Sequence, residues 1–86
     1  MHHELKILPC YFRAIVDGGK KFEIRNNADR GFQKGDTVSL EEIEKGEVFD
    51  EKTGNKVLVR ITYVTDYNQP PNQVVFGFEV VQVIEI

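Results

Sequence analysis

The chain has 86 residues, of which 41% are hydrophobic and 29% are charged, and its net charge at pH 7 is −3. This composition is globular and excludes disordered and fibrous proteins, and the length predicts a single domain over residues 1–86. No apolar run is long enough to cross a membrane and no signal peptide is recognisable, so we expect a cytoplasmic protein without a membrane partner. Cys10 is the only cysteine, which excludes an internal disulfide, and neither a metal nor another cofactor is expected.

Charge is unevenly distributed along the chain. Residues 1–36 contain seven Lys or Arg and five Asp or Glu, a net charge of +2, whereas residues 37–86 have a net charge of −5. The acidic total argues against tight non-specific binding to nucleic acid, which depends on neutralised phosphates. A site for an anion is therefore expected within the first 36 residues.

The first expected elements are a strand over residues 4–8 and a helix over residues 9–17. Pro9 suits the first turn of a helix, and Gly18 with Gly19 provides a left-handed stop at its end. The apolar side chains of this helix share one arc, which we expect to face the core: Tyr11, Phe12, Ile15 and Val16.

The next expected strand, over residues 20–25, contains most of the side chains that could bind a ligand. Because a strand alternates its faces, Phe22 and Ile24 point together and are expected to anchor it in the core. The opposite face presents three charged side chains: Lys21, Glu23 and Arg25. A cation, an anion and a second cation in a row suit a small polar ligand or a phosphate.

A polar loop over residues 26–31 follows and is the expected ligand-contacting loop, with Phe32 holding its far end to the core. The remaining segments are a turn at 34–36, a strand over 37–43, an acidic hairpin or extended loop over 41–56, and strands over 56–66 and 74–86. The last segment is expected to form one long strand, or two strands divided by a bulge, because its apolar phase slips after Val80. A chain that is mainly β, with one or two short helices, predicts a small twisted barrel.

Two tyrosines lie within or just after the predicted strand over residues 56–66. Tyr63 shares the phase of Val59 and Ile61 and is expected in the core, whereas Tyr67 lies at a strand end and is a candidate for stacking on a base.

The two histidines lie near the start of the chain. His2 is expected to belong to a frayed terminus, and His3 is expected to lie in a strand near the cleft. A metal site built on this pair is not expected, because adjacent strand residues face opposite ways.

Several of these segments together resemble the ASCH domain family of the PUA-like superfamily, in a short ASCH-like branch. The central motif is Gly18-x-Lys20-x-x-Glu23-x-Arg25. Agreement continues in residues 5–12, Asp29-Arg30-Gly31-Phe32, Gly35-Asp36, residues 61–67 and Val75-x-Gly77-Phe78. The resemblance covers nearly the whole chain. It implies a PUA-like β-barrel with a helix packed at one end, and a cleft in which the charged motif residues meet RNA or a nucleobase derivative.

The same resemblance raises the question of catalysis. Some ASCH proteins are amidohydrolases of acetylated cytidine in which the motif lysine, here Lys20, is essential. Those members carry a threonine where this chain has Glu23, and their further acidic residue lies in a helical insertion where this chain has the short segment 66–73. Whether the chain is an enzyme stays open at this point.

The candidate ligand-binding residues are Lys20, Lys21, Glu23, Arg25, Asn27, Asp29, Arg30 and Tyr67. Alternation selects Lys21 as the neighbour of Glu23, whereas the family motif selects Lys20. We prefer Lys20 because alternation need not hold at a turn. The alternatives are solvated lysines and a purely structural pair between Glu23 and Arg25. For Asp29 and Arg30 the favoured interpretation is a turn and a salt bridge within the loop.

Three functions remain compatible with these observations. The preferred one is a binding module for RNA or a modified nucleoside or nucleotide. The second is an amidohydrolase acting on an acylated nucleobase such as acetylcytidine, with Lys20 as base or nucleophile activator and Glu23 as proton shuttle. The third is a protein-interaction module that uses the final strand as an edge.

Overall fold

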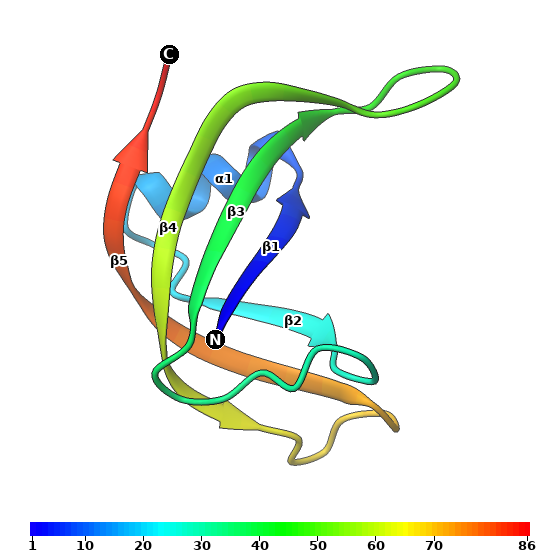
Figure 1. Cartoon of the computed structure of the whole chain (residues 1–86), viewed down its shortest axis with the longest axis vertical. Coiled ribbons are helices and arrows are strands. Elements are labelled where there is room, and N and C mark those ends of the chain that lie inside the picture. Colours follow the sequence, from blue (N-terminus) through cyan, green and yellow to red (C-terminus); the bar gives the residue numbers. More distant parts are fainter.

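The computed structural model describes residues 1–86 and contains one helix and five strands (Figure 1). The elements in chain order are β1 (His2–Ile7), α1 (Pro9–Val16), β2 (Phe22–Asn26), β3 (Thr37–Glu44), β4 (Glu51–Thr65) and β5 (Gln73–Ile84). The predicted mainly β structure with one short helix is confirmed. The acidic segment after residue 40 forms a hairpin between β3 and β4, one of the two expected forms. No helix is long or apolar enough to span a membrane.

The five strands form one sheet in the order β1-β3-β4-β5-β2. β1 pairs with β3 in parallel, and the other three pairs are antiparallel. The sheet curls strongly into a half-barrel, with β4 and β5 bent along their length (Figure 1). β1 and β2 are the two edges of the sheet, so the backbone of each lacks a strand partner on one side.

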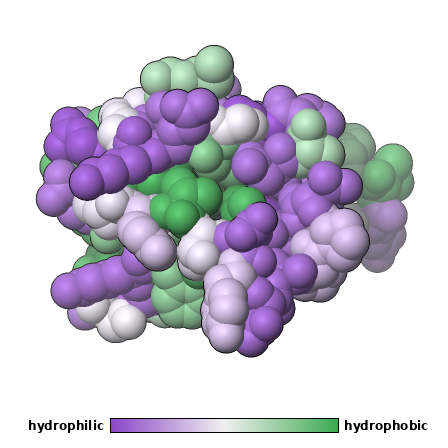
Figure 2. Space-filling view, turned by 90° about the horizontal axis from the view of Figure 1, so that it is seen from below, coloured by the Kyte–Doolittle hydropathy of each residue, from purple (hydrophilic) through white to green (hydrophobic).

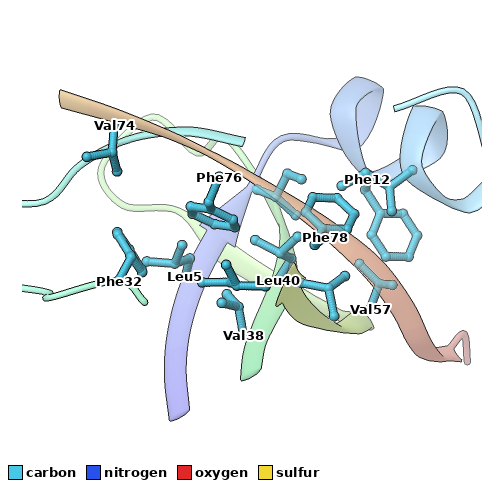
Figure 3. Packing of buried hydrophobic residues seen from close by; sticks show 13 residues of the cluster. Leu5, Phe12, Phe32, Val38, Leu40, Val57, Val74, Phe76 and Phe78 are labelled. Carbon is cyan, nitrogen blue, oxygen red and sulfur yellow. The ribbon is translucent and has the colours of Figure 1, made fainter. Parts of the chain in front are cut away.

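The interior of the curl holds a cluster of 13 buried hydrophobic residues (Figure 3). Every strand except β2 contributes to it, and α1 adds Phe12 and Ile15, which are 0% and 1% exposed. The phenylalanines form a chain of contacts, with ring centroids 4.9 Å apart for Phe32 and Phe76 and 6.3 Å apart for Phe76 and Phe78. The predicted anchoring of the polar loop by Phe32 is therefore confirmed.

The helix lies where local signals predict it. Pro9 is its first residue, and the chain leaves it through Gly18, whose φ of +90° is left-handed. The backbone N–H groups of Gly19 and Lys20 both donate to the carbonyl oxygen of Ala14, which turns the chain sharply into β2. Tyr11, expected in the apolar core arc, is instead 51% exposed at the end of that arc.

β4 and β5 each contain a bulge, which changes the face of the sheet on which the following side chains lie. In β4 the register shifts between Ile61 and Tyr63, so Thr62 is an extra residue and the phase inverts. The prediction that Tyr63 lies in the core is therefore wrong, and its side chain is 65% exposed. In β5 the partners of β4 jump from Gln82 to Val80, so the expected bulge is present, and it lies within one continuous strand.

One buried polar pair joins β1 to the start of β3. The Nε2 atom of His3 lies 2.9 Å from Oδ2 of Asp36, and both residues are buried. An ionised carboxylate only accepts hydrogen bonds, so Nε2 carries the hydrogen. Burial raises the pKa of Asp36, but hydrogen bonds from His3, the Met1 amino group and the Gln33 N–H outweigh it, so the pKa lies below its usual 3.8.

The expectation that His2 is frayed is wrong. It belongs to β1, where it pairs with Thr37, and its Nδ1 lies 2.6 Å from the hydroxyl oxygen of that residue. His3 lies in the same strand, as expected, but points to the opposite side, into the core against Phe32. The two imidazoles therefore do not meet, because neighbouring strand residues alternate.

Replacing Asp36 by Asn should destabilise the fold in a pH-dependent way. Because the folded pKa of Asp36 is below 3.8, the ionised carboxylate stabilises the native state above that pH, and this stabilisation is lost as the pH falls through the folded pKa. At pH 7 we expect Asp36→Asn to lower the free energy of unfolding by about 1–3 kcal/mol. Between about pH 4 and pH 2, its stability should depend less steeply on pH than that of the unmodified chain.

Chemical denaturation monitored by circular dichroism at several pH values measures both quantities. Asp29→Asn is the matched control, because Asp29 is exposed and makes no ion pair. Equal stability and equal pH slopes for the two variants would contradict the role of the buried carboxylate.

Candidate functional site

The two edges of the sheet approach each other across a seam that side chains bridge. The guanidinium Nη2 of Arg25 in β2 donates to the carbonyl oxygen of Lys6 in β1 at 2.8 Å. Further along, Nη1 of Arg30 lies 3.4 Å from the carbonyl oxygen of Glu4. Two arginines thus reach backbone acceptors of β1 that have no strand partner on that side.

A cleft of about 520 Å³ lies at this seam. Its wall comes from β1, the start of α1, the turn before β2, and β2 itself: Lys6, Ile7, Leu8, Tyr11, Lys20, Phe22, Glu23, Ile24 and Arg25. Four of these residues are charged and the others are apolar or aromatic. The volume is in the range of small-molecule sites, about 300–1,000 Å³.

Glu23 is the centre of an ionic network in this wall. Its side chain is only 6% exposed, and Oε2 accepts from Nζ of Lys20. The other oxygen, Oε1, accepts from Nε of Arg25 at 2.9 Å and lies 2.7 Å from Nη2 of the same guanidinium. The Lys20 ammonium also donates to the carbonyl oxygen of Phe22 at 2.6 Å.

β2 faces the opposite way from the prediction. Its side chains alternate as expected, but Glu23 is 4% exposed, whereas Phe22 and Ile24 are 45% and 51% exposed. The prediction that Phe22 and Ile24 anchor the strand in the core is therefore wrong. The register gives the reason. Glu23 pairs with Phe76, and directly paired residues share a face of the sheet, so the charged face of β2 is the one that faces into the curl.

A buried carboxylate is stable here because its partners are complete. Carboxylates are costly to bury unless they are paired and hydrogen-bonded. Each oxygen of Glu23 binds one cation, Lys20 at Oε2 and Arg25 at Oε1. No buried side-chain nitrogen or oxygen in the chain lacks a hydrogen-bond partner. The predicted ion pair between Glu23 and Arg25 is therefore present, and it has Lys20 as a third member.

The structure separates the two candidate lysines. Lys20 lines the cleft, and its Nζ lies 5.5 Å from the centroid of the Tyr11 ring and 5.0 Å from that of Phe22. Lys21 is exposed and lies in a second hollow. Its carbonyl oxygen accepts from the N–H of Phe78, which continues the pairing of β2 with β5.

The polar loop candidates have structural partners. Asn27 is half-buried, and its side-chain oxygen accepts from the N–H of Phe32 at 2.8 Å. Asp29 and Arg30 lie in a turn over residues 28–30, which confirms the predicted turn. The predicted salt bridge between them is wrong, because Asp29 is exposed and Arg30 is directed at β1 instead. Tyr67 is 77% exposed in the turn between β4 and β5 and does not line the cleft.

Sequence reasoning missed six residues of the cleft wall: Lys6, Ile7, Leu8, Tyr11, Phe22 and Ile24. Tyr11, Phe22 and Ile24 were expected in the core because they are apolar at core-like spacing. No local pattern indicates which of the apolar side chains on such a face stay exposed. Lys6 is 19 positions from Arg25 in the chain, and their contact depends on the curl of the whole sheet.

No group of three or more His, Cys, Asp or Glu side chains is placed to hold a metal ion.

A second hollow of about 500 Å³ lies between α1 and β5, with Val16, Val80 and Val83 in its wall. β2 pairs only with residues 73–77 of β5, so no strand covers residues 79–84 on the side away from β4. Seen from below, most of the surface is polar, with a small apolar area recessed near the centre (Figure 2).

Two comparisons with known proteins bear on this site. A family model described as Domain of unknown function (DUF3850) matches residues 2–78, a range that includes every cleft residue. The chain is also similar to an uncharacterized 12.9 kDa protein in the GpA 3′ region of Escherichia phage P2, with 45% identity over 64 residues. That alignment covers 74% of this chain and 54% of the phage protein, so the chain spans about half the length of this relative.

Replacing Glu23 by Gln should destabilise the protein more than a similar change at an exposed glutamate. The neutral amide cannot balance Lys20 and Arg25, which then keep their desolvation without the carboxylate. Removing one member of a buried ionic network costs about 2–4 kcal/mol. The measurement is the free energy of unfolding by chemical denaturation.

Glu79→Gln is the matched control, because Glu79 forms an exposed ion pair with Arg60 at 3.1 Å. Such pairs contribute about 0–1 kcal/mol. A loss for Glu23→Gln no larger than that for Glu79→Gln would show that the network does not hold the seam together.

Proposed function

The chain belongs to the DUF3850 family, and we propose that it is a binding module for a nucleoside, a nucleotide or a short RNA segment, which it holds in the cleft between β1 and β2. The observation that carries this proposal is the position of the Lys20, Glu23 and Arg25 network beside exposed aromatic side chains in one cleft. Hydrogen-bond donors next to aromatic faces are what recognition of an unpaired base requires.

The aromatic part of the cleft supports this function. Tyr11 and Phe22 are 51% and 45% exposed, and both rings line the cleft with Lys20 above them. Exposed aromatic residues in a concave wall offer stacking surface, because every nucleobase has an apolar face. Ile24, also about half exposed, extends this apolar wall.

The overall charge favours a short ligand over a long duplex. With a net charge of −3, the chain lacks the basic surface that tracks many phosphates. Its cations near the seam are few, and two of them share one carboxylate. Recognition in this cleft would depend on one base and its close surroundings.

We also propose that the chain is related to the ASCH domain family. Three polar residues of the motif Gly18-x-Lys20-x-x-Glu23-x-Arg25 converge in the cleft, and Gly18 provides the left-handed turn that brings Lys20 back over β2. The convergence of the motif residues on one cleft is the arrangement that this relationship would require.

Hydrolysis of an acylated nucleobase is the second candidate function, and the contact between Lys20 and Glu23 favours it. A lysine and a carboxylate in direct contact at a cleft can pass a proton between them while water attacks an amide carbonyl. The products would be acetate and cytidine if acetylcytidine is the substrate.

Titration with nucleosides and short single-stranded RNA tests the binding function. In two-dimensional NMR spectra, we expect shift changes at Tyr11 and at residues 18–31. Phe22→Ala should weaken binding by about fivefold or more, because base–aromatic stacking contributes about 1–3 kcal/mol. Phe49→Ala is the control, since Phe49 is 67% exposed and lies outside the cleft. Evenly scattered shifts, or equal losses for both variants, would refute the proposal.

An assay of acetylcytidine hydrolysis tests the enzymatic alternative. Turnover should be abolished in Lys20→Ala and retained in Lys34→Ala, because Lys34 is exposed and outside the cleft. Release of acetate is the measured signal. Absence of turnover by the unmodified chain at high enzyme concentration would end this alternative.

A further inference from the structure

Resting on the function proposed above, we propose that the cleft binds the carbonyl edge of a nucleobase rather than a phosphate group. Some hydrogen-bonding groups in the cleft wall are already used within the protein, and the groups that stay free determine which ligand atoms can bind there. The net charge that remains once Glu23 has paired with its two cations determines which ligand charge is tolerated.

Arg25 keeps one nitrogen free. Its Nε donates to Glu23, and its Nη2 serves both Glu23 and the carbonyl oxygen of Lys6, whereas Nη1 has no partner. Because no buried side-chain nitrogen lacks a partner, this Nη1 is open to solvent. A guanidinium has five N–H groups, so the two on Nη1 remain available for a ligand.

Lys20 and Glu23 add one donor and very little acceptor capacity. The Lys20 ammonium has three N–H groups and uses two of them, for Glu23 and for the carbonyl oxygen of Phe22. Glu23 is 4% exposed and is already bound through both oxygens. The charged side chains of the cleft therefore offer donors and almost no acceptors, and they match a ligand edge made of acceptor atoms. The Tyr11 hydroxyl, which can donate or accept, fits either kind of edge.

The charge of the network favours a neutral acceptor. Two cations and one carboxylate leave a net charge of only +1, and a phosphate monoester with about −1.5 to −2 charges would lie close to the Glu23 carboxylate. Lys6 also lines the cleft but is exposed, where water and salt screen its charge. A carbonyl oxygen accepts the same hydrogen bonds without repelling Glu23.

The apolar wall completes the match to a base. Tyr11 and Phe22 stand beside the free donors, so a flat ring that stacks on them can direct its carbonyl oxygens at Lys20 and Arg25. Uracil, cytosine and guanine carry such oxygens. Adenine carries no carbonyl oxygen. Its acceptors are ring nitrogens with one lone pair each, and the amino group that lies between N1 and N7 would face the donors of the cleft.

The test compares ligands on the unmodified chain, by calorimetry or NMR titration. Uridine and uridine 5′-monophosphate should bind within about threefold of each other, adenosine should bind at least fivefold more weakly than uridine, and excess inorganic phosphate should not compete. A monophosphate that binds tenfold more tightly, together with competition by inorganic phosphate, would overturn this inference and leave the proposed function standing. Equal affinity for adenosine would also overturn it. If no nucleoside, nucleotide or RNA binds, both proposals fail.

Arg25→Lys provides the second readout. It keeps the positive charge but removes the Nη1 donors, and we expect uridine affinity to fall about tenfold, as for the loss of a hydrogen bond from a charged donor. Arg60→Lys is the matched control, because Arg60 is exposed on β4 and pairs with Glu79. Unchanged uridine affinity in a folded Arg25→Lys variant would overturn the inference. If this variant fails to fold, the ligand comparison still decides, since it needs no substitution.

Discussion

The buried carboxylate of Glu23, held between Lys20 and Arg25, is the interaction on which the candidate site depends. The sheet curls until its two edges approach, but they do not pair as strands, so the seam needs side chains that bind unpaired backbone groups. Arg25 does this by donating to the carbonyl oxygen of Lys6 while Glu23 fixes its orientation. A guanidinium held by a carboxylate is positioned before any ligand arrives, which lowers the entropy lost on binding.

The same constraint explains why the cleft is both polar and apolar. Because the charged face of β2 turns into the curl, Phe22 and Ile24 on its other face stay about half exposed. The first turn of α1 adds Tyr11 beside them. An edge strand with its ionic side chains inside and its apolar side chains outside is unfavourable for a structural element alone, and such conflicts between local pattern and fold are expected at functional sites.

Local signals were predictable from the sequence, whereas long-range placement was not. Pro9 and Gly18 mark the helix ends because they act through their own backbone angles. Alternation in β2 correctly groups Phe22 with Ile24, but alternation cannot say which face the rest of the sheet covers. Tyr63 was misplaced because one extra residue in β4 inverts the phase, and such a bulge leaves little trace in a regular apolar pattern.

The most direct test of the account is to locate a bound nucleoside relative to the aromatic side chains. In a complex with isotope-labelled protein, intermolecular nuclear Overhauser effects report base protons that lie close to protein protons. We expect such effects between the uridine ring protons and the rings of Tyr11 and Phe22, which line the cleft. Effects to Tyr63 or Tyr67 instead, both exposed outside the cleft, would contradict it.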